Sequence, residues 1–286
     1  MAMQATKLAI DGGAKAIGEV DPELFRWPIV TSEDEEAVLD VLRRGAMSGT
    51  EITKRFESKF KNWMGMHFAL GYPNGTESIR AAMWACGVGA GDEIICPSMT
   101  FWASAAQALS LGASVNFCDI DRNTLCIAPH DIEHRIGSRT KAIVVVHYAG
   151  HPCEMDEIME IASRHKLKVI EDVSHAQGSL YKGRMCGTIG HVGAMSLMSG
   201  KSFATGEAGI LVTNDRQIYE NCVAYGHYER TGTASRFNEP DNQITDATLA
   251  RFSGVPIGGY KHRMNQLSSA MGLVQLKHYP SRIAEI

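Results

Sequence analysis

Two segments of the chain carry side chains that are able to do chemistry together. The first, KVIEDVSHAQG, places Asp172 at the end of an apolar run, and the second, AMSLMSGKSFATGEAG, places Lys201 in a loop of small residues. A lysine amine can form an imine with a carbonyl compound. A carboxylate can hold a ring nitrogen in its protonated form, which makes the ring an acceptor of electrons.

Each of these residues also has a simpler interpretation. An aspartate at a strand end often caps the following helix, and Asp172 taken alone favours that role. A single loop lysine is usually solvated surface, although burial and a nearby cation can lower its pKa from the ordinary value of about 10.4. Taken together, Asp172 and Lys201 are the pair that a pyridoxal-phosphate enzyme must supply, and this combination favours the chemical interpretation.

A third segment, NGTES at 74–78, follows the apolar run HFALGY and opens a predicted helix. Gly75 allows the backbone to approach a ligand, Thr76 offers a hydroxyl, and the free N–H groups of a helix start favour a phosphate. Ser196, five residues before Lys201, can reach the same phosphate. A plain capped helix start explains 74–78 equally well, and a buried serine bonded to the backbone would give the same pattern at Ser196.

Aromatic side chains near these segments are candidates for contact with a flat ligand. Phe101, in CPSMTFWASAAQ, follows the apolar run EIICP and can stack on a heterocycle. Either Phe101 or the adjacent Trp102 can instead belong to the core, which is the commoner place for an aromatic residue. His175, three residues after Asp172, is interpreted as a hydrogen-bond donor to a bound ring.

The histidines do not predict a metal site. His147 and His151 are four residues apart, but Gly150 and Pro152 break the helix that joint ligation at this spacing would require. No GxSxG, HExxH or Walker lysine motif occurs in the sequence. We therefore expect no metal.

The elements that would position these residues alternate along the chain. Seven short runs rich in Val, Ile and Phe are typical of buried strands: HFALGY, EIICP, SVNFCD, KAIVVVHY, KVIED, VGAMSL and GILVTN. Most of them are separated by stretches with helical spacing. The apolar helix faces that this spacing predicts comprise Val38, Leu39 and Leu42 in SEDEEAVLDVLRRG, and Ile158, Ile161 and Ala162 in MDEIMEIASRHK.

This alternation predicts an α/β fold with a parallel sheet covered by helices on both faces. In such sheets the ligand binds at the carboxyl ends of the strands, which is where the candidate residues lie. The polar, poorly periodic segment from about 231 to 256 is interpreted as an extended loop or lid. A last helix is expected in MNQLSSAMGLVQLKHY.

Composition excludes several classes of partner. The chain has 286 residues, 28 basic against 32 acidic side chains and no sustained basic run, so nothing favours nucleic acid or an anionic membrane. The apolar runs are too short to span a bilayer, and no export signal is evident, so we expect neither. The seven cysteines form no CxxC pair, and their odd number argues for a reducing cytoplasm.

Taken together, the segments resemble the DegT/DnrJ/EryC1/StrS family of pyridoxal-phosphate-dependent aminotransferases, which act on keto-sugars, keto-cyclitols and related precursors. The resemblance runs in order through IDGGAKAI, GTEITKRFESKF, NGTES, PSMTFWASA, NFCDID, EDVSHAQGSLYKGRMCGTIG, the Lys201 segment and GGYKHRMNQLSSAMGLVQL, so it covers nearly the whole chain. It implies the large domain of fold-type I transferases, with a mostly parallel seven-stranded sheet and helices on both faces. The expected division is an N-terminal segment over 1–30, this cofactor-binding domain over 31–255, and over 256–286 the start of a connection to a C-terminal small domain.

The resemblance also implies roles for single residues. Lys201 would hold the cofactor through an imine and carry protons, while Asp172 would hold the pyridine nitrogen. Phe101 would stack on the ring, and His175 falls where many members have a glutamine near the ring hydroxyl. Gly75, Thr76 and Ser196 would bind the phosphate. The chain has GYKHRM where the family often shows GYNYRM, so Lys261 replaces an asparagine that in relatives reaches the neighbouring subunit's phosphate, which implies a homodimer with shared sites. A lysine there could bind that phosphate as a point charge, or equally a phosphate or carboxylate of the substrate.

The function implied is transfer of an amino group from glutamate or glutamine to a keto-sugar, keto-cyclitol or related precursor. Two alternatives within the family are a sugar dehydratase, whose members typically carry histidine at the position of Lys201, and a cofactor-binding pseudoenzyme or regulatory protein without turnover. A third, an unrelated nucleotide-binding α/β module, predicts a glycine-rich loop that GYPNGTES matches poorly. Family members continue into a smaller domain after the QL helix, whereas this sequence ends there, so it is either a fragment of a longer protein or a truncated form.

Overall fold

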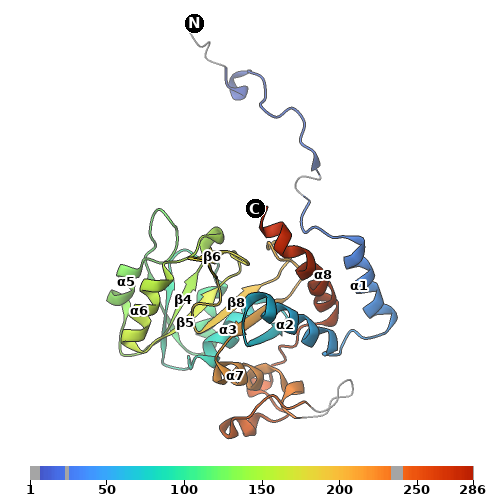
Figure 1. Ribbon diagram of the computed structural model, residues 1–286. Helices are drawn as coiled ribbons and strands as arrows, with labels where there is room; N and C mark the ends of the chain where they lie inside the picture. The colour runs from blue at the N-terminus through green and yellow to red at the C-terminus, as the bar shows by residue number, and fades with distance from the viewer. Residues whose placement is uncertain (1–6, 23–25, 233–240, 286) are drawn as a thin grey trace.

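The computed structural model describes residues 7–22, 26–232 and 241–285, and its centre is a seven-stranded sheet (Figure 1). All seven predicted strands form. They are β1 (Phe68–Tyr72), β2 (Glu93–Pro97), β3 (Ser114–Cys118), β4 (Thr140–Val146), β5 (Lys168–Asp172), β8 (Val192–Ser196) and β9 (Gly209–Thr213). Their order across the sheet is β1-β9-β8-β5-β4-β2-β3. A separate two-stranded hairpin joins β6 (Leu180–Tyr181) to β7 (Arg184–Met185).

The sheet is parallel except for one strand. β2 pairs in parallel with β3 and β4, β4 with β5, and β5 with β8, whereas β9 runs antiparallel between β8 and β1. Because the parallel strands share one direction, their carboxyl ends meet at one edge of the sheet. The register places Val146 beside Asp172, and Asp172 beside Ala194, two residues before the end of β8.

Eight α-helices lie in the described residues, and all but the first cover the sheet. They are α1 (Ser32–Arg43), α2 (Glu51–Met64), α3 (Gly75–Ala85), α4 (Ala103–Ser110), α5 (Pro129–Arg135), α6 (Met155–His165), α7 (Arg216–Gly226) and α8 (Gln266–Ile283). In Figure 1, α5 and α6 lie at one end of the molecule and α1 and α8 at the other.

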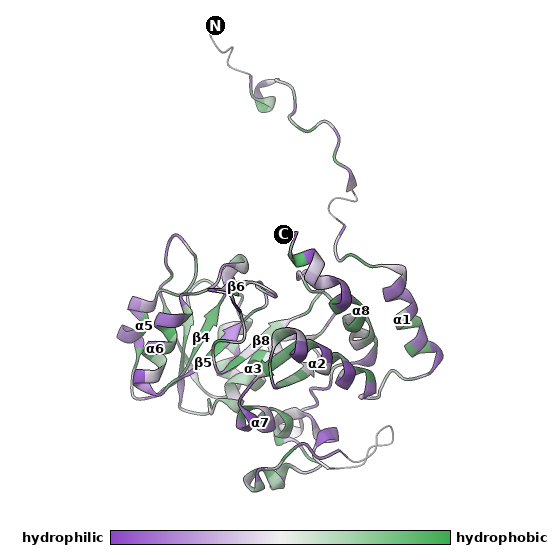
Figure 2. Cartoon of the chain, in the orientation of Figure 1, coloured by the Kyte–Doolittle hydropathy of each residue, from purple (hydrophilic) through white to green (hydrophobic). Residues whose placement is uncertain are grey.

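Alternate side chains of the strands point to opposite faces, and both faces are buried. On one face Ile94 and Val144 pack with α3, α4 and α7, while on the other Ile95 and Val145 pack with α5 and α6. The second face continues over β8 and β9 to α2 and α8. Figure 2 shows the corresponding pattern, with hydrophobic strands inside and hydrophilic surfaces on the outer helices. The predicted three-layer α/β fold is therefore confirmed.

Helix α6 buries Ile158, Ile161 and Ala162 as predicted. Helix α8 forms where it was expected and extends to Ile283. In the segment predicted to be a lid, residues 233–240 lie outside the described residues, but the 3-10 helix Ala247–Phe252 packs its apolar side chains against α7. This described part of the segment is therefore structural rather than a free lid.

The predicted buried face of α1 was wrong. Leu39 and Leu42 are 40% and 46% exposed, whereas Val41 is 1% exposed and packs beside α2 and α8. The reason is local: Asp34 closes a capping box with Thr31 and also accepts a hydrogen bond from Gln275 Nε2 of α8 at 2.9 Å. These contacts turn the Asp34–Val41 side of the helix inward.

None of the helices in the described ranges combines the length and the apolar character that crossing a membrane requires.

Candidate active site

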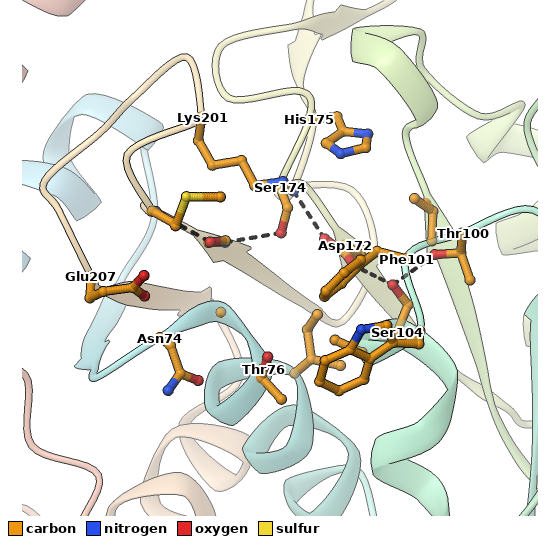
Figure 3. Close-up of a pocket in the computed structure, with 17 residues that line it drawn as sticks. Asn74, Thr76, Thr100, Phe101, Ser104, Asp172, Ser174, His175, Lys201 and Glu207 are labelled. Atoms are coloured by element: carbon orange, nitrogen blue, oxygen red, sulfur yellow. Dashed lines mark hydrogen bonds between the residues drawn. The ribbon is translucent and has the colours of Figure 1, made fainter. Parts of the chain in front are cut away.

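A cavity of about 380 Å³ opens at the carboxyl edge of the sheet. Its floor comes from the ends of three parallel strands, which contribute Val146, Asp172 and Ser196. Its walls come from the starts of α3 and α4 and from the loop between β8 and β9 (Figure 3). The cavity thus lies where a doubly wound sheet places its ligand.

Asp172 is the last residue of β5 and is only 5% exposed. Its Oδ1 accepts a hydrogen bond from the Ser174 amide at 3.0 Å, and its Oδ2 accepts one from the Ser104 hydroxyl at 2.6 Å. A buried carboxylate needs such donors because it has left water. The bonds fix the carboxyl group at the base of the cavity (Figure 3).

Lys201 lies in the loop that follows β8, and its side chain lines the same cavity as Asp172. The loop is held by backbone bonds, including Ser199 N to Gly206 O at 2.9 Å, and the Trp27 indole donates to the Lys201 carbonyl at 2.9 Å. Burial lowers the pKa of the Lys201 ammonium, against the opposing charge of Asp172. The amine is therefore more readily neutral than that of a solvated lysine.

The amino-terminal end of α3 forms another wall. Asn74 caps the helix by accepting from the Glu77 amide at 2.9 Å, and the amides of Gly75 and Thr76 in the first turn have no acceptor in the preceding turn. A Cβ at Gly75 would lie 2.6 Å from Ser196 Cβ, so only glycine lets this helix start approach the end of β8. Thr76 and Ser196 both line the cavity, which gives it a compact set of donors for an anion.

The two adjacent aromatic residues at the mouth of the cavity are not core. Phe101 is 57% and Trp102 59% exposed, and their ring centroids are 4.8 Å apart. Both line the cavity. Their rings are thus available to a flat ligand, which is the arrangement expected from sequence for Phe101.

His175 lines the cavity three residues beyond Asp172, with its ring centroid 5.7 Å from that of Tyr148. Burial and the charge of Lys201 lower the pKa of His175, against the opposing effect of Asp172. The ring is therefore neutral at neutral pH and can donate one hydrogen bond.

Seven of the eight residues predicted for the site thus line one cavity. They are Gly75, Thr76, Phe101, Asp172, His175, Ser196 and Lys201. Lys261 does not line it: it is exposed in the segment before α8. Its predicted role, binding the neighbouring subunit's cofactor phosphate or an anionic group of the substrate, stays a prediction.

Sequence reasoning missed several polar residues of the cavity. Thr100 and Ser104 lie beside Asp172, while Glu207 lies on the Lys201 side and Asn74 at the helix start (Figure 3). The spacing of Asp172 and Ser174 is a recognisable signal, because an aspartate often accepts from the amide two residues on. Ser104 gives no such signal, since its partner is 68 residues away.

No group of three or more His, Cys, Asp or Glu side chains in the part of the chain that the structure describes is arranged to hold a metal ion. The cavity instead combines a primary amine, a buried carboxylate, an exposed aromatic pair and a helix start with adjacent hydroxyls. This set of donors suits a flat, phosphorylated carbonyl compound with a basic ring nitrogen. Fold and site together define an α/β protein of the type that binds pyridoxal phosphate.

The chain belongs to the DegT/DnrJ/EryC1/StrS aminotransferase family, whose match covers residues 28–285. Pyridoxal phosphate is the cofactor that membership of this family indicates. The resemblance proposed from the sequence is therefore confirmed.

Among curated proteins, the chain is 35% identical over 251 residues to a GDP-perosamine synthase from Escherichia coli O157:H7, covering 87% of this chain and 64% of that protein. It is 37% identical over 222 residues to an L-glutamine:2-deoxy-scyllo-inosose aminotransferase from Streptomyces kanamyceticus, covering 75% of this chain and 51% of the relative. The chain thus spans between half and two thirds of the length of these curated relatives.

Solved structures give the same fold. An aminotransferase from Psychrobacter cryohalolentis is 35% identical, with a TM-score of 0.78 over 90% of this chain and 64% of that one. A GDP-4-keto-6-deoxymannose-3-dehydratase with bound GDP-perosamine is 27% identical, with a TM-score of 0.78 over 91% of this chain and 70% of that one. The predicted fold-type I architecture is confirmed by these neighbours.

Proposed function

We propose that the protein is a pyridoxal-phosphate-dependent aminotransferase that moves an amino group from glutamate or glutamine to a keto-sugar, keto-cyclitol or related precursor. The observation that carries this proposal is the cavity that holds the half-buried amine of Lys201 together with the buried carboxylate of Asp172. A surface lysine or a simple helix cap would not need to share a cavity with the other residue.

The two residues act at different atoms. Bound pyridoxal phosphate supplies an aldehyde for imine formation and a ring that accepts electrons. The Nζ atom of Lys201 would hold the cofactor at its aldehyde carbon and, when free, would move a proton between two carbons of the reacting centre. The carboxylate of Asp172 keeps a proton on the ring nitrogen.

The remaining residues orient the cofactor. The amides of Gly75 and Thr76, with the hydroxyls of Thr76 and Ser196, line the cavity at the start of α3 and would bind the phosphate. Phe101 would cover one face of the ring, and His175 would donate a hydrogen bond to the ring hydroxyl.

The choice of substrates is supported by the relatives. One is named for GDP-perosamine synthesis, and another for transfer from L-glutamine to 2-deoxy-scyllo-inosose. Both names describe amination of a hydroxylated ring compound, which is why we propose this acceptor class for the chain.

The test is a measurement of both half-reactions. Purified protein loaded with pyridoxal phosphate is mixed with glutamate or glutamine, which should remove the cofactor's imine absorbance, and a keto-sugar or keto-cyclitol should then restore it. Lys201→Ala should abolish the cycle, whereas Lys59→Ala, at an exposed position of α2, should leave it unchanged. Full turnover by Lys201→Ala would overturn the catalytic assignment.

The same measurement separates the alternatives. A dehydratase is favoured by the structural likeness to the dehydratase described above, and it would release a deoxygenated keto-sugar without incorporating nitrogen from a labelled donor. A pseudoenzyme would bind the cofactor without loss of absorbance on adding any donor. We expect labelled nitrogen in the product, because Lys201 stands where dehydratases of this family typically carry histidine.

We also propose that the protein acts as a cytoplasmic homodimer with sites shared between subunits. All seven cysteines are unpaired, which suits a reducing compartment. Three exposed residues are available to a second subunit: Phe101, Trp102 and Lys261.

Light scattering on the purified protein should give twice the chain mass. A weaker affinity for pyridoxal phosphate in Lys261→Ala would support the role of Lys261 across the interface. The division at 30 and 255 stays a prediction.

A further inference from the structure

Ser104, in the first turn of α4, has a buried hydroxyl that donates directly to the carboxylate of Asp172. It is 0% exposed, and its hydroxyl donates to Asp172 Oδ2 at 2.6 Å. An ionised carboxylate can only accept hydrogen bonds, so the single proton of the Ser104 hydroxyl must point to Asp172. This leaves the oxygen of Ser104 free to accept.

Thr100 supplies the matching donor. Its hydroxyl donates to Ser104 Oγ at 2.8 Å, from the segment between β2 and α4. The two hydrogen bonds therefore run in one direction, from the Thr100 hydroxyl to Ser104 and from the Ser104 hydroxyl to Asp172 (Figure 3). Hydrogen bonds in such a chain polarise one another, and a bond that ends on a charge is stronger than one between neutral groups.

The other oxygen of Asp172 is held independently. Oδ1 accepts from the Ser174 amide at 3.0 Å, so the backbone after β5 orients one side of the carboxyl group and the hydroxyl chain orients the other. The two supports differ in kind: the Ser174 amide is a backbone group that substitutions at Ser104 and Thr100 leave in place, whereas the hydroxyl groups are removed by them. Their contribution can therefore be measured by mutation.

We propose that Ser104 and Thr100 are positioning residues that fix the orientation and the negative charge of Asp172 toward the ring nitrogen of the cofactor. This proposal rests on the proposed function. Without the hydrogen bonds from Thr100 to Ser104 and from Ser104 to Asp172, the carboxylate would lose its shorter hydrogen bond and could rotate about the Cβ–Cγ bond. The proton shared with the ring nitrogen would then be held less firmly on the ring.

A purely structural role makes a different prediction. If the two hydroxyls only satisfy each other's hydrogen-bonding needs in the protein interior, their loss destabilises the fold but leaves the electronic state of the bound cofactor unchanged. The two roles therefore differ in the pH titration of cofactor absorbance, which reports protonation of the bound cofactor and does not depend on the stability of the fold.

The experiment compares wild type, Ser104→Ala and Thr100→Val, with Ser110→Ala at the exposed end of α4 as the matched control. Each protein is loaded with pyridoxal phosphate and reduced with borohydride, and its cofactor absorbance is titrated with pH. Cofactor Kd, kcat, KM and the unfolding midpoint without cofactor complete the set. Thr100→Val keeps the side-chain shape and removes only the donor, so it covers the case in which Ser104→Ala folds poorly.

We expect all four proteins to form the borohydride-stable adduct at Lys201. Ser104→Ala should shift the absorbance titration and lower kcat about ten- to a hundredfold with little change in acceptor KM, as expected for loss of a hydrogen bond to a charged group. Thr100→Val should shift both in the same direction by less, and Ser110→Ala should match wild type.

The proposal is overturned if Ser104→Ala and Thr100→Val keep the wild-type titration and kcat, even when their unfolding midpoints fall. If the wild-type protein forms no adduct with pyridoxal phosphate, the proposed function is contradicted, and the positioning role of Ser104 and Thr100 with it. If wild type forms the adduct but Ser104→Ala and Thr100→Val keep its absorbance titration and kcat, only the positioning role of the two hydroxyl groups is contradicted.

Discussion

At the scale of single residues, the cavity brings together groups that would not indicate cofactor chemistry if each were taken alone. The carboxylate of Asp172 is buried and accepts one hydrogen bond at each oxygen, and the amine of Lys201 is partly removed from water. These environments suit the two side chains to different tasks, because hydrogen bonds hold the carboxyl group of Asp172 in place while burial makes the amine of Lys201 easier to neutralise.

Replacing the carboxylate of Asp172 by an amide tests the first task. Asp172→Asn keeps a carbonyl oxygen for the Ser104 hydroxyl but has no charge to hold a proton on the ring nitrogen. We expect kcat to fall about a hundredfold or more, the magnitude typical of losing one preorganised electrostatic contact, while far-ultraviolet circular dichroism stays the same. A variant with more than half of the wild-type kcat would show that this carboxylate has no such task.

The pH dependence of cofactor uptake tests the second task. Burial lowers the pKa of Lys201 from the ordinary value of 10.5, so the neutral amine should become available at lower pH than in a free lysine. The rate of borohydride trapping with pyridoxal phosphate should therefore reach half its maximum at a lower pH for the protein than for N-acetyl-lysine amide. Coincident midpoints would mean that the Lys201 amine is as solvated as that of the small molecule.

The sequence was sufficient to find the residues whose roles are tied to short local patterns. Asp172 follows an apolar strand, Gly75 and Thr76 open a helix, and Lys201 lies among small residues. The hydroxyl of Ser104 could not be found in this way, because its importance arises from a contact across 68 positions of the chain.

At the scale of elements, a second buried carboxylate positions the strand that carries Asp172. Glu171 is 0% exposed and points to the opposite face of β5. It accepts hydrogen bonds from His147 Nε2 at 2.9 Å and from the amides of Gly187 and Ile189 at 2.7 and 2.8 Å. His147 Nδ1 accepts from the Cys153 amide at 3.0 Å, so its ring carries its proton on Nε2.

Removing the charge of Glu171 should loosen this junction between β4, β5 and the turn before β8. We expect Glu171→Gln to lower the free energy of unfolding by about 3 kcal/mol, because several buried donors lose a charged acceptor. Urea denaturation at neutral pH measures the change. A loss below about 0.5 kcal/mol would mean that the turn does not depend on this carboxylate.

Wild type and Glu171→Gln should also differ in how their free energies of unfolding depend on pH, and the direction of this difference can be predicted. Burial alone would raise the pKa of Glu171, but the hydrogen bonds from His147 and from backbone amides outweigh it and lower the pKa below the ordinary 4.5. A lowered carboxyl pKa stabilises the fold fully above the ordinary value, and that stabilisation is lost as the pH falls through the folded-state pKa. The difference between wild type and Glu171→Gln should therefore shrink below about pH 4.5.

The strands were predictable because each is a short apolar run buried on both faces, which leaves little choice of structure. The orientation of α1 was not. Its sequence has apolar residues at Val38, Leu39, Val41 and Leu42, and two overlapping faces satisfy helical spacing. The bond from Gln275 to Asp34 selects one of them, and that contact depends on α8, more than 200 positions away.

At the scale of the whole molecule, the parallel strands deliver the cavity residues to one edge. This gathering follows from the α/β pattern, so the location of the site was predictable before its detailed contacts were. The packing of the segment after 241 against α7 was not predictable, because its few apolar residues, including Leu249 and Phe252, show no clear helical or strand periodicity.

Cofactor binding should stabilise the whole fold. A ligand that binds only the folded state at a hundred times its Kd adds about 2.7 kcal/mol to the free energy of unfolding. We expect pyridoxal phosphate to produce a gain of this size in wild type, and a much smaller one in Lys201→Ala at the same cofactor concentration. Equal gains in urea denaturation would show that the cofactor binds without Lys201.

The most direct test of the central claim is to locate the covalent adduct. Protein incubated with pyridoxal phosphate is reduced with borohydride, digested and analysed by mass spectrometry, with Lys59→Ala and Lys201→Ala treated in parallel. The account predicts one stoichiometric phosphopyridoxyl group on the peptide that contains Lys201, present in wild type and in Lys59→Ala and missing from Lys201→Ala. Stoichiometric labelling of another lysine, or none in wild type, would contradict it.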